Sequence, residues 1–283
     1  MPHLVGQRRE TFPCSQVTQG SGRWALSFGV AAERGRLRML DLHCHILPGV
    51  DDGSASLEES LAMARFCVRD GITHIVATPH CHCRLLRADI LPHVARLRDA
   101  LAAANIPLSV MPGSEVQVTD TATYRREFDA GLYCHLGDGS AFTLLEFNWK
   151  PEQYPPDATE LIGWLRDRGT TPIIAHPERH SFFADDPGRL RALVEAGAWL
   201  QVTVDSLLGN HGPAPRASGE LLLREYPESV LATDAHNLKR CSGLSAGYSW
   251  VGDCLGAVRA DSLRARADQV LAAVSPQREG NGP

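Results

Sequence analysis

The sequence predicts a single-domain α/β protein built as a closed barrel, and three observations lead to this prediction. Short, apolar, β-prone runs recur along the chain, and helical stretches separate most of them. Strands that alternate with helices pair in parallel. About seven such units fit a closed barrel better than an open, doubly wound sheet, and no Gly-rich dinucleotide-binding motif follows the first run.

Each predicted strand is a short apolar run bounded by turn or helix signals. In chain order the runs are "RLRMLDLH", "THIVATPH", "PLSVMPGSE", "FTLLEF", "TPIIAHPE", "AWLQVTV" and "SVLATDAH". The clearest helix follows the first run: Ser56 is a suitable N-cap, Glu59 completes a capping box, and Gly71 ends the helix. The residues expected on its buried face are Leu57, Leu61, Ala64 and Val68.

The composition is that of an ordinary globular protein with enough apolar material for a core. Of its 283 residues, 43% are hydrophobic and 22% are charged. The formal net charge of -5 does not suggest a nucleic-acid-binding surface. No apolar run approaches the roughly 18 residues that a membrane-spanning helix needs. We therefore expect neither a nucleic-acid partner nor a membrane span.

The cysteines indicate a reducing compartment. Eight of them are scattered along the chain, and no secretion signal precedes them. A chain of this length does not need disulfides for stability, so we expect a cytoplasmic protein with free thiols. The stretch "HCHC", residues 80–83, resembles half of a zinc site, but it lacks a second Cys/His pair at finger spacing.

The two ends of the chain differ in composition from the rest. Residues 1–38 mix Gly, Ser, Gln and Arg with isolated apolar residues, and we expect a poorly ordered extension there. Residues 276–283 are expected to be a flexible tail. The predicted barrel therefore occupies residues 39–275.

Imidazole or carboxylate side chains stand near the carboxyl ends of six of the seven predicted strands. In βα barrels these ends meet at one face, where the loops converge on a cavity. The sixth strand offers only Gln201 and Thr203 at this position. The residues are His43, His45 and Asp52, then His80, Glu115, Glu146, His176, and finally Asp234 and His236.

This set of side chains is typical of a metal site with more than one ion. His43 and His45 are two residues apart on a strand, so both can point to the same face. Neutral imidazole and carboxylate together suit Mn²⁺, Fe²⁺ or Zn²⁺. Nine ligands exceed the needs of one ion, so we expect two or three ions, with Glu115 as a bridge. Clustered divalent ions generate hydroxide near neutral pH and stabilise the attacking and leaving oxygens at phosphorus, so we expect phosphoester hydrolysis.

Other histidines carry weaker signals. A lone histidine at a strand end is more often a hydrogen-bonded structural residue than a ligand. We interpret His3, His74, His93, His135 and His211 in this way. His82 and His180 lie near the predicted site in the sequence, and a loop position accounts for both.

The motifs "DLHCHILPGVDDG", "ATPH", "GSE", "LLEF", "IAHPER" and "TDAHN" resemble, in this order, the bacterial metal-dependent protein-tyrosine phosphatases of the polymerase-and-histidinol-phosphatase (PHP) superfamily. More narrowly, they resemble the capsule and exopolysaccharide type. The likeness runs from Met39 to about Arg240. It implies a distorted (β/α)7, TIM-like barrel that holds up to three ions, usually Mn²⁺.

The resemblance also implies roles for individual residues. All nine side chains named above would be metal ligands, and Arg179 would contact the phosphate. One fitting grouping places His43, His45, Glu115 and Asp234 on one ion, Glu115, Glu146 and His176 on a second, and Asp52, His80 and His236 on a third. A metal-bridging hydroxide would attack phosphotyrosine. Asp51 would lie behind the ligands or act as an acid, and either Asp51 or a metal-bound water would protonate the leaving group. Gly53 would let the loop turn back towards the metals.

The family analogy further implies a partner, a bacterial tyrosine autokinase that acts in polysaccharide export. The chain departs from the family at two places. Lys239 and Arg240 stand where the family often has one arginine after its "DxHN" motif, and His180 follows "HPER". Neither departure removes a predicted ligand.

Four alternatives stay open beside this reading. Cys81 and Arg87 have the spacing of cysteine-nucleophile tyrosine phosphatases, although no glycine lies between them. The site could instead act on histidinol phosphate, another small phosphomonoester or a nucleic-acid end. The chain could also be a non-catalytic, metal-binding regulator. An amidohydrolase also begins with HxH, but it commonly has a lysine where this chain has Glu146.

Overall fold

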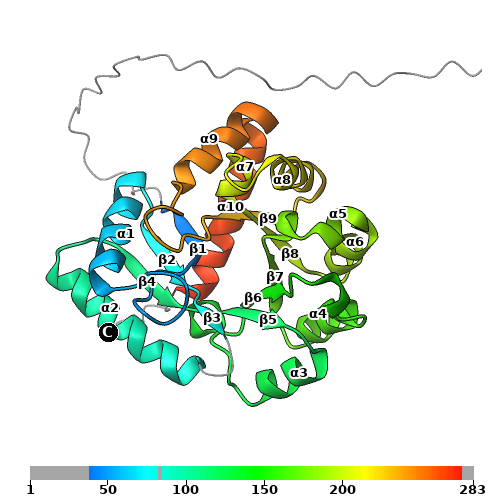
Figure 1. Cartoon of the computed structure of the whole chain (residues 1–283), viewed down its shortest axis with the longest axis horizontal. Helices are drawn as coiled ribbons and strands as arrows, with labels where there is room; N and C mark the ends of the chain where they lie inside the picture. Colours follow the sequence, from blue (N-terminus) through cyan, green and yellow to red (C-terminus); the bar gives the residue numbers. More distant parts are fainter. Residues whose placement is uncertain (1–37, 82–84, 276–283) are drawn as a thin grey trace, which may run out of the picture. The chain divides into compact units, whose positions relative to one another are not determined.

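The structure, a computed structural model, describes residues 38–81 and 85–275 (Figure 1). Apart from Arg38, the predicted amino-terminal extension lies outside the described residues, as do the predicted tail and His82. The strands are β1 (Leu40–Cys44), β2 (His74–Ala77), β3 (His80–Cys81), β4 (Ser109–Pro112), β5 (Glu115–Val118), β6 (Phe142–Phe147), β7 (Thr171–Ala175), β8 (Trp199–Thr203) and β9 (Ser229–Ala232).

Helices surround these strands (Figure 1). They are α1 (Leu57–Asp70), α2 (Arg87–Ala103), α3 (Thr121–Asp129), α4 (Ala158–Asp167), α5 (Ser181–Asp185), α6 (Pro187–Glu195), α7 (Val204–Leu207), α8 (Pro213–Glu225), α9 (Leu244–Leu255) and α10 (Ala257–Val274). Three short 3-10 turns are η1 (Leu136–Asp138), η2 (Pro151–Gln153) and η3 (Pro177–Arg179). Within the described residues, no helix is both long enough and apolar enough to cross a membrane.

The strands pair in parallel and confirm the predicted barrel, with two of its strands broken. One sheet has the order β1-β2-β4 and the other has the order β3-β5-β6-β7-β8-β9. The predicted second strand is divided into β2 and β3, and the predicted third into β4 and β5. Pro79 and Pro112 lie at the two breaks, and proline has no N–H to donate to a strand ladder.

The first and last strands meet and close the ring. The N–H of His45 donates to the carbonyl oxygen of Ala235 at 2.8 Å, and the N–H of Asp234 donates to the carbonyl oxygen of His43 at 2.9 Å. The buried carboxylate of Asp41 accepts a hydrogen bond from the N–H of Thr233 at 3.0 Å. These bonds bring the HxH motif beside the DxH motif, nearly two hundred residues later.

Apolar side chains fill the barrel and helix α10 closes one end of it. Leu40 and Phe142, at the starts of β1 and β6, belong to one buried cluster with Val270 and Leu271 of α10. Figure 1 shows α10 behind the strands. Because α10 covers the amino ends of the strands, only their carboxyl ends remain for a functional site.

Helix α1 confirms the predicted N-cap Ser56 and the end at Gly71. The Glu59 carboxylate, predicted to complete a capping box, accepts instead from the N–H of Ala55 at 2.9 Å. The Ser56 hydroxyl accepts from the N–H of Glu59 at 3.2 Å, and Gly71 ends the helix with φ 96°. Leu57, predicted to be buried, is 45% exposed. Instead Ser60 is buried because its hydroxyl donates to the carbonyl oxygen of Ile46 at 2.7 Å. Of the other residues predicted on this face, Ala64 is buried, and Leu61 and Val68 are partly buried against the core. The residues buried on α1 are Ser60, Met63, Ala64 and Cys67.

Candidate metal centre

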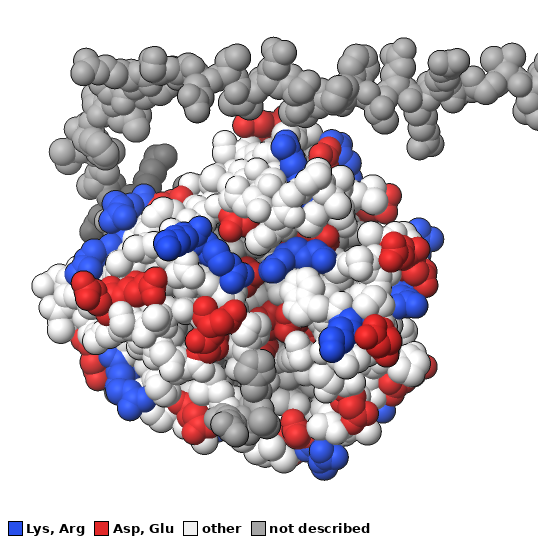
Figure 2. All heavy atoms as spheres, viewed as in Figure 1, with Lys and Arg blue, Asp and Glu red and all other residues white. Residues whose placement is uncertain are grey.

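A cavity of about 420 Å³ opens at the carboxyl ends of the strands, and we call it the metal hollow. Figure 2 shows a hollow near the middle of this face, with acidic side chains in it and basic side chains at its edge. His43 and His45 are fully buried and do not line it. The other predicted site residues all do, namely Asp51, Asp52, His80, Glu115, Glu146, His176, Arg179, Asp234 and His236.

Four ligand atoms converge at the closure of the barrel. His43 Nε2 lies 3.1 Å from His45 Nε2, and 3.3 Å from both Glu115 Oε2 and Asp234 Oδ1. His45 Nε2 lies 3.4 Å from the same two oxygens. Ligand bonds of about 2.0–2.1 Å in a tetrahedral site would separate the ligand atoms by about 3.3 Å. The spacing of the two imidazole nitrogens and Asp234 Oδ1 therefore fits one divalent ion, and Glu115 Oε2 lies at the same spacing from both nitrogens.

The hydrogen bonds behind the two histidines support this reading. His43 Nδ1 lies 2.8 Å from Gln201 Oε1, and His45 Nδ1 lies 2.7 Å from Asp51 Oδ2. Both partners can only accept at these atoms, so in each neutral ring Nδ1 carries the hydrogen and Nε2 presents its lone pair. Lone pairs and carboxylate oxygens then face one another, an arrangement that a bound cation stabilises.

The charges around His43 lead to the same conclusion. Burial by itself would lower the pKa of His43, but the carboxylates of Glu115 and Asp234 raise that pKa to about 9. A positive charge at this point is therefore strongly favoured, whether a proton or a metal ion supplies it. The residues present thus fit a metal ion.

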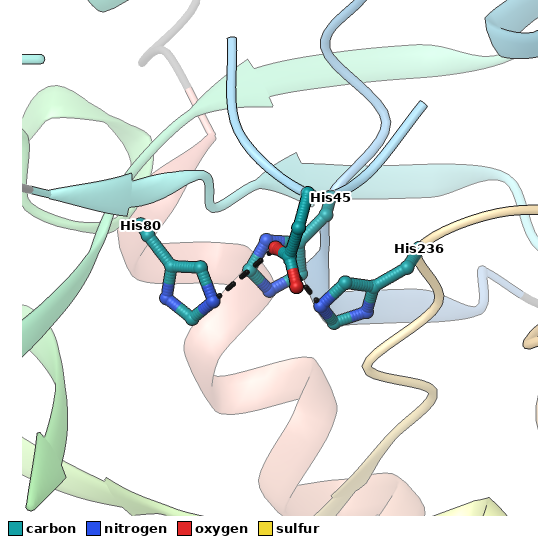
Figure 3. A group of neighbouring side chains, drawn as sticks. His45, His80 and His236 are labelled. Carbon is teal, nitrogen blue, oxygen red and sulfur yellow. Dashed lines mark ion pairs between the residues drawn. The ribbon is translucent and has the colours of Figure 1, made fainter. Parts of the chain in front are cut away.

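A second group lies nearer to solvent and contains His45, Asp52, His80 and His236. His80 Nε2 and His236 Nε2 each lie 3.5 Å from Asp52 Oδ1. In Figure 3, His80 and His236 point from opposite sides towards this carboxylate, and His45 lies behind it. The Asp52 side chain is 62% exposed. This group resembles the predicted third ion site, with His45 added.

Glu115 occupies the centre of the arrangement. Its Oε1 lies 2.9 Å from His176 Nε2, whereas its Oε2 faces His43 and His45 and lies 3.0 Å from His80 Nδ1. The two oxygens of one carboxylate thus serve different groups, as expected of a bridging ligand. Glu146 Oε1 is farther from His176 Nε2, at 3.9 Å, and Glu146 forms a group with His80 and Glu115 instead.

Two of these residues have backbone conformations that are unusual for side chains other than glycine. His176 has φ 33° and Asp234 has φ 52°, both in the left-handed region. Such strain concentrates at functional sites, where the surrounding structure holds it in place. His176 directly follows β7, and Asp234 lies shortly after β9. At each position the local turn directs the side chain into the metal hollow.

Comparison with known proteins identifies the family. Residues 39–271 match the family model for capsular polysaccharide synthesis, CpsB/CapC. The chain belongs to the CpsB/CapC family. It is 35% identical over 204 residues to the tyrosine-protein phosphatase YwqE of Bacillus subtilis, a match that covers 71% of this chain and 78% of YwqE. It is 28% identical over 239 residues to the tyrosine-protein phosphatase CpsB of Streptococcus pneumoniae, covering 80% of this chain and 94% of CpsB.

Solved structures agree with this family. The crystal structures described as those of YwqE from Bacillus subtilis and CpsB from Streptococcus pneumoniae, "unique metal-dependent tyrosine phosphatases", include a match with a TM-score of 0.77 and 33% identity. This match covers 83% of this chain and 95% of that chain. The resemblance read from the sequence motifs is therefore confirmed.

Asp51 lies behind the ligands in this CpsB/CapC chain. Its carboxylate accepts from His45, from the N–H of Gly53 at 2.9 Å and from the N–H of His80 at 3.0 Å. Burial would raise the pKa of Asp51, but the hydrogen bond and the charge of His45, together with the two N–H groups, lower it to about 2. A carboxylate that stays ionised in this way orients His45 and is poorly suited to donate a proton.

Arg179 and Trp149 form one wall of the metal hollow. Arg179 Nη1 donates to Asp234 Oδ2 at 2.6 Å, and the guanidinium carbon lies 4.9 Å from the centre of the Trp149 ring. Trp149 is 44% exposed and was not predicted from the sequence. No pattern in "EFNWKP" distinguishes this tryptophan from a surface residue of the loop after β6.

The ring of His180 stacks on the ring of Trp149. The two rings stack with their centroids 4.3 Å apart and their planes at 25°. His180 is buried, and neither of its ring nitrogens has a hydrogen-bond partner among the described residues. Burial and the neighbouring His176 lower the pKa of His180 to about 3. His180 is thus a neutral ring that supports Trp149. From the sequence we interpret it only as a loop residue.

Cys81 is poorly suited to be a nucleophile in this family member. Its thiol is buried and donates to the carbonyl oxygen of Leu85 at 3.2 Å. Burial, with a smaller effect of Glu127, raises the pKa of Cys81 to about 12, so the reactive thiolate is disfavoured. Arg87, which would have to bind the phosphate, forms an ion pair with Asp138 at 2.6 Å.

Proposed function

We propose that this protein is a metal-dependent phosphomonoesterase that removes the phosphoryl group from phosphotyrosine in a protein of capsule or exopolysaccharide synthesis. The observation that carries the proposal is that Nε2 of His43 and Nε2 of His45 lie 3.1 Å apart, with Glu115 Oε2 and Asp234 Oδ1 each 3.3–3.4 Å from both nitrogens, in a CpsB/CapC chain. Its relatives YwqE and CpsB are named tyrosine-protein phosphatases.

The proposed ligands are those predicted from the sequence: His43, His45, Asp52, His80, Glu115, Glu146, His176, Asp234 and His236. Their donor atoms are imidazole nitrogens and carboxylate oxygens, and no cysteine belongs to the groups found in the described residues. We propose two or three Mn²⁺ ions, with Fe²⁺ or Zn²⁺ as alternatives. When bound, such ions activate water at neutral pH and offset the negative charge of a phosphoryl group.

Three side chains of the protein would bind and orient the substrate and one of the ligands. Arg179 would donate from its guanidinium to the phosphoryl oxygens, held in place by Asp234. Trp149 would place its indole beside the phenyl ring of the substrate. Asp51 would keep His45 in the tautomer that presents Nε2. A tyrosine leaving group has a pKa of about 10, so it needs less protonation than an alkoxide does.

The proposed substrate is a bacterial tyrosine autokinase of polysaccharide export, which we infer from the family's role in capsular polysaccharide synthesis. A cytoplasmic location suits such a substrate. It also suits the free thiols among the described residues, those of Cys44, Cys67, Cys81, Cys134 and Cys241.

The test is hydrolysis of p-nitrophenyl phosphate and a phosphotyrosine peptide, with Mn²⁺ or with EDTA. We expect wild-type protein with Mn²⁺ to hydrolyse both substrates, and EDTA or His43→Ala to reduce the rate to background. His93→Ala is the matched control, because His93 lies on α2 outside the metal groups and should keep full activity. Activity that survives both EDTA and His43→Ala would contradict the proposal. A much higher kcat/KM for histidinol phosphate than for the peptide would show that the substrate is a small phosphomonoester and not a phosphotyrosine protein.

A further inference from the structure

A second cavity of about 570 Å³ adjoins the metal hollow, and we call it the basic hollow. Its lining residues come from the turn after β7, the segment around α7 and the loop after β9. They are Arg179, Asp205, Asn210, His211, Lys239 and Arg240. Arg179 and Arg240 also line the metal hollow, so two guanidinium groups stand between the two cavities.

The basic hollow has an excess of positive charge. Arg179, Lys239 and Arg240 face a single carboxylate, that of Asp205. Asp205 is buried, and its Oδ1 already accepts from Asn210 Nδ2 at 2.7 Å and from the hydroxyl of Ser242. Its charge is therefore directed at its own loop. Arg179 is paired with Asp234, so the excess positive charge is that of Lys239 and Arg240.

Two of these cations are available to a ligand. Within residues 38–81 and 85–275, neither the Lys239 ammonium nor the Arg240 guanidinium has a hydrogen-bond or ion-pair partner. Their loop is held in one shape by Asn237, whose Oδ1 accepts from the N–H of Lys239 at 3.0 Å and of Arg240 at 3.1 Å. Preorganised, unpaired cations are the groups that a bound anion pairs with.

We propose that the basic hollow binds an anionic group of the substrate, either a carboxylate or a second phosphoryl group, on a residue next to the phosphotyrosine in the sequence. This inference rests on the proposed function, because the metal hollow must hold the phosphotyrosine. An extended chain advances about 3.3 Å per residue, so a side chain within two or three residues reaches across the shared wall. The basic hollow thus selects substrates with negative charge beside the phosphotyrosine.

The experiment compares peptides that carry one phosphotyrosine flanked by Ala, by Glu, or by a second phosphotyrosine. The full-length protein with Mn²⁺ should show a KM about fivefold lower for the two anionic peptides than for the Ala peptide at low ionic strength. This preference should shrink at high salt, since exposed charges are screened. A gain with Glu identifies a carboxylate ligand, and a gain with phosphotyrosine alone identifies a phosphoryl ligand; either supports the subsite.

Charge reversal tests the residues. Lys239→Glu should abolish or invert the preference while kcat/KM for p-nitrophenyl phosphate stays within about twofold, because that substrate does not reach the basic hollow. The control is Arg191→Glu, which changes the net charge equally at an exposed position on α6 and should leave the preference intact. Equal KM values for all three peptides in wild type, or a preference that persists in Lys239→Glu, would overturn the subsite.

The outcomes separate this inference from the proposed function. Hydrolysis of every peptide without charge preference would leave the phosphatase and remove the subsite. If no peptide were hydrolysed, the proposed function would fail, and the subsite would be judged by binding. For that arm, the peptides carry a non-hydrolysable phosphonate in place of the phosphotyrosine phosphate, and their Kd values are measured by fluorescence anisotropy. Equal Kd values for all three peptides would then overturn the subsite as well.

Discussion

The Nδ1 atom of His43 lies 2.8 Å from Oε1 of Gln201, across the interior of the barrel. Gln201 belongs to β8, the one predicted strand that supplies no ligand. The same oxygen accepts from the N–H of His176 at 3.3 Å, and Gln201 Nε2 donates to Thr203 Oγ1 at 3.1 Å. Gln201 therefore fixes which nitrogen of His43 carries the hydrogen and leaves Nε2 for the proposed metal ion.

Gln201→Leu should lower the affinity for Mn²⁺ about 10- to 100-fold, because His43 loses the acceptor that holds its tautomer. Gln201→Glu keeps an oxygen opposite Nδ1 and should retain most of the affinity. Calorimetric titration of the metal-free proteins with Mn²⁺ measures both values, and circular dichroism checks the fold. Equal affinities in wild type and Gln201→Leu would show that this contact has no role in metal binding.

Asp51→Asn should reduce kcat/KM about 10- to 100-fold, since one amide cannot accept from His45, Gly53 and His80 together. The loss should be the same for p-nitrophenyl phosphate and for a phosphotyrosine peptide. A residue that protonates the leaving group would instead matter much more for the poorer leaving group, tyrosine. A loss confined to the phosphotyrosine peptide would therefore assign the proton donor to Asp51 and reject the orienting role.

Trp149→Ala should raise KM for a phosphotyrosine peptide about three- to tenfold with little change in kcat, because the phenyl ring loses an aromatic neighbour. Trp149→Phe keeps an aromatic face above His180 and is the control that should restore KM. Steady-state kinetics on a phosphotyrosine peptide and a matching phosphoserine peptide measure the effect. The same rise in KM for both peptides would indicate a general distortion of the metal hollow.

Gly53→Ala should destabilise the protein by about 1–3 kcal/mol, because a Cβ at this position would overlap the carbonyl oxygen and the Cβ of His45. Urea unfolding measures the change, and Mn²⁺ affinity should fall with it since His45 is displaced. Gly252→Ala in α9 is the control: an added Cβ meets no atom within 4 Å outside its own helix, and stability should not fall. A neutral Gly53→Ala would contradict the close approach of the loop to β1.

Much of the metal centre was predictable because it depends on local sequence. His43 and His45 alternate on one strand, so their shared face follows from strand geometry alone. Each other proposed ligand lies near the end of an apolar run, and parallel strands in a barrel bring those ends together. The caps of α1 at Ser56 and Gly71 were predictable for the same reason, since each involves residues a few positions apart.

Relationships between strands were decided by the tertiary structure. The two oxygens of Glu115 face different groups. Glu146 groups with Glu115 as predicted, but with His80 in place of His176. Such distances depend on how β5, β6 and β7 are staggered and on where the ring closes, which no single segment encodes. The predicted buried face of α1 omitted Ser60 for a similar reason, because this serine is held inside by a distant carbonyl group, that of Ile46.

By itself the sequence determined which chemical groups this protein offers: imidazole and carboxylate at strand ends, a glycine where the loop must approach β1, and the motifs of its family. Only the tertiary structure decided which of them act together. It placed Gln201 behind His43, Trp149 on His180, and the cations of the basic hollow beside the metal hollow. The physical reason is that ligand identity is a property of single residues, whereas charge balance, tautomer and stacking arise between residues brought together by folding.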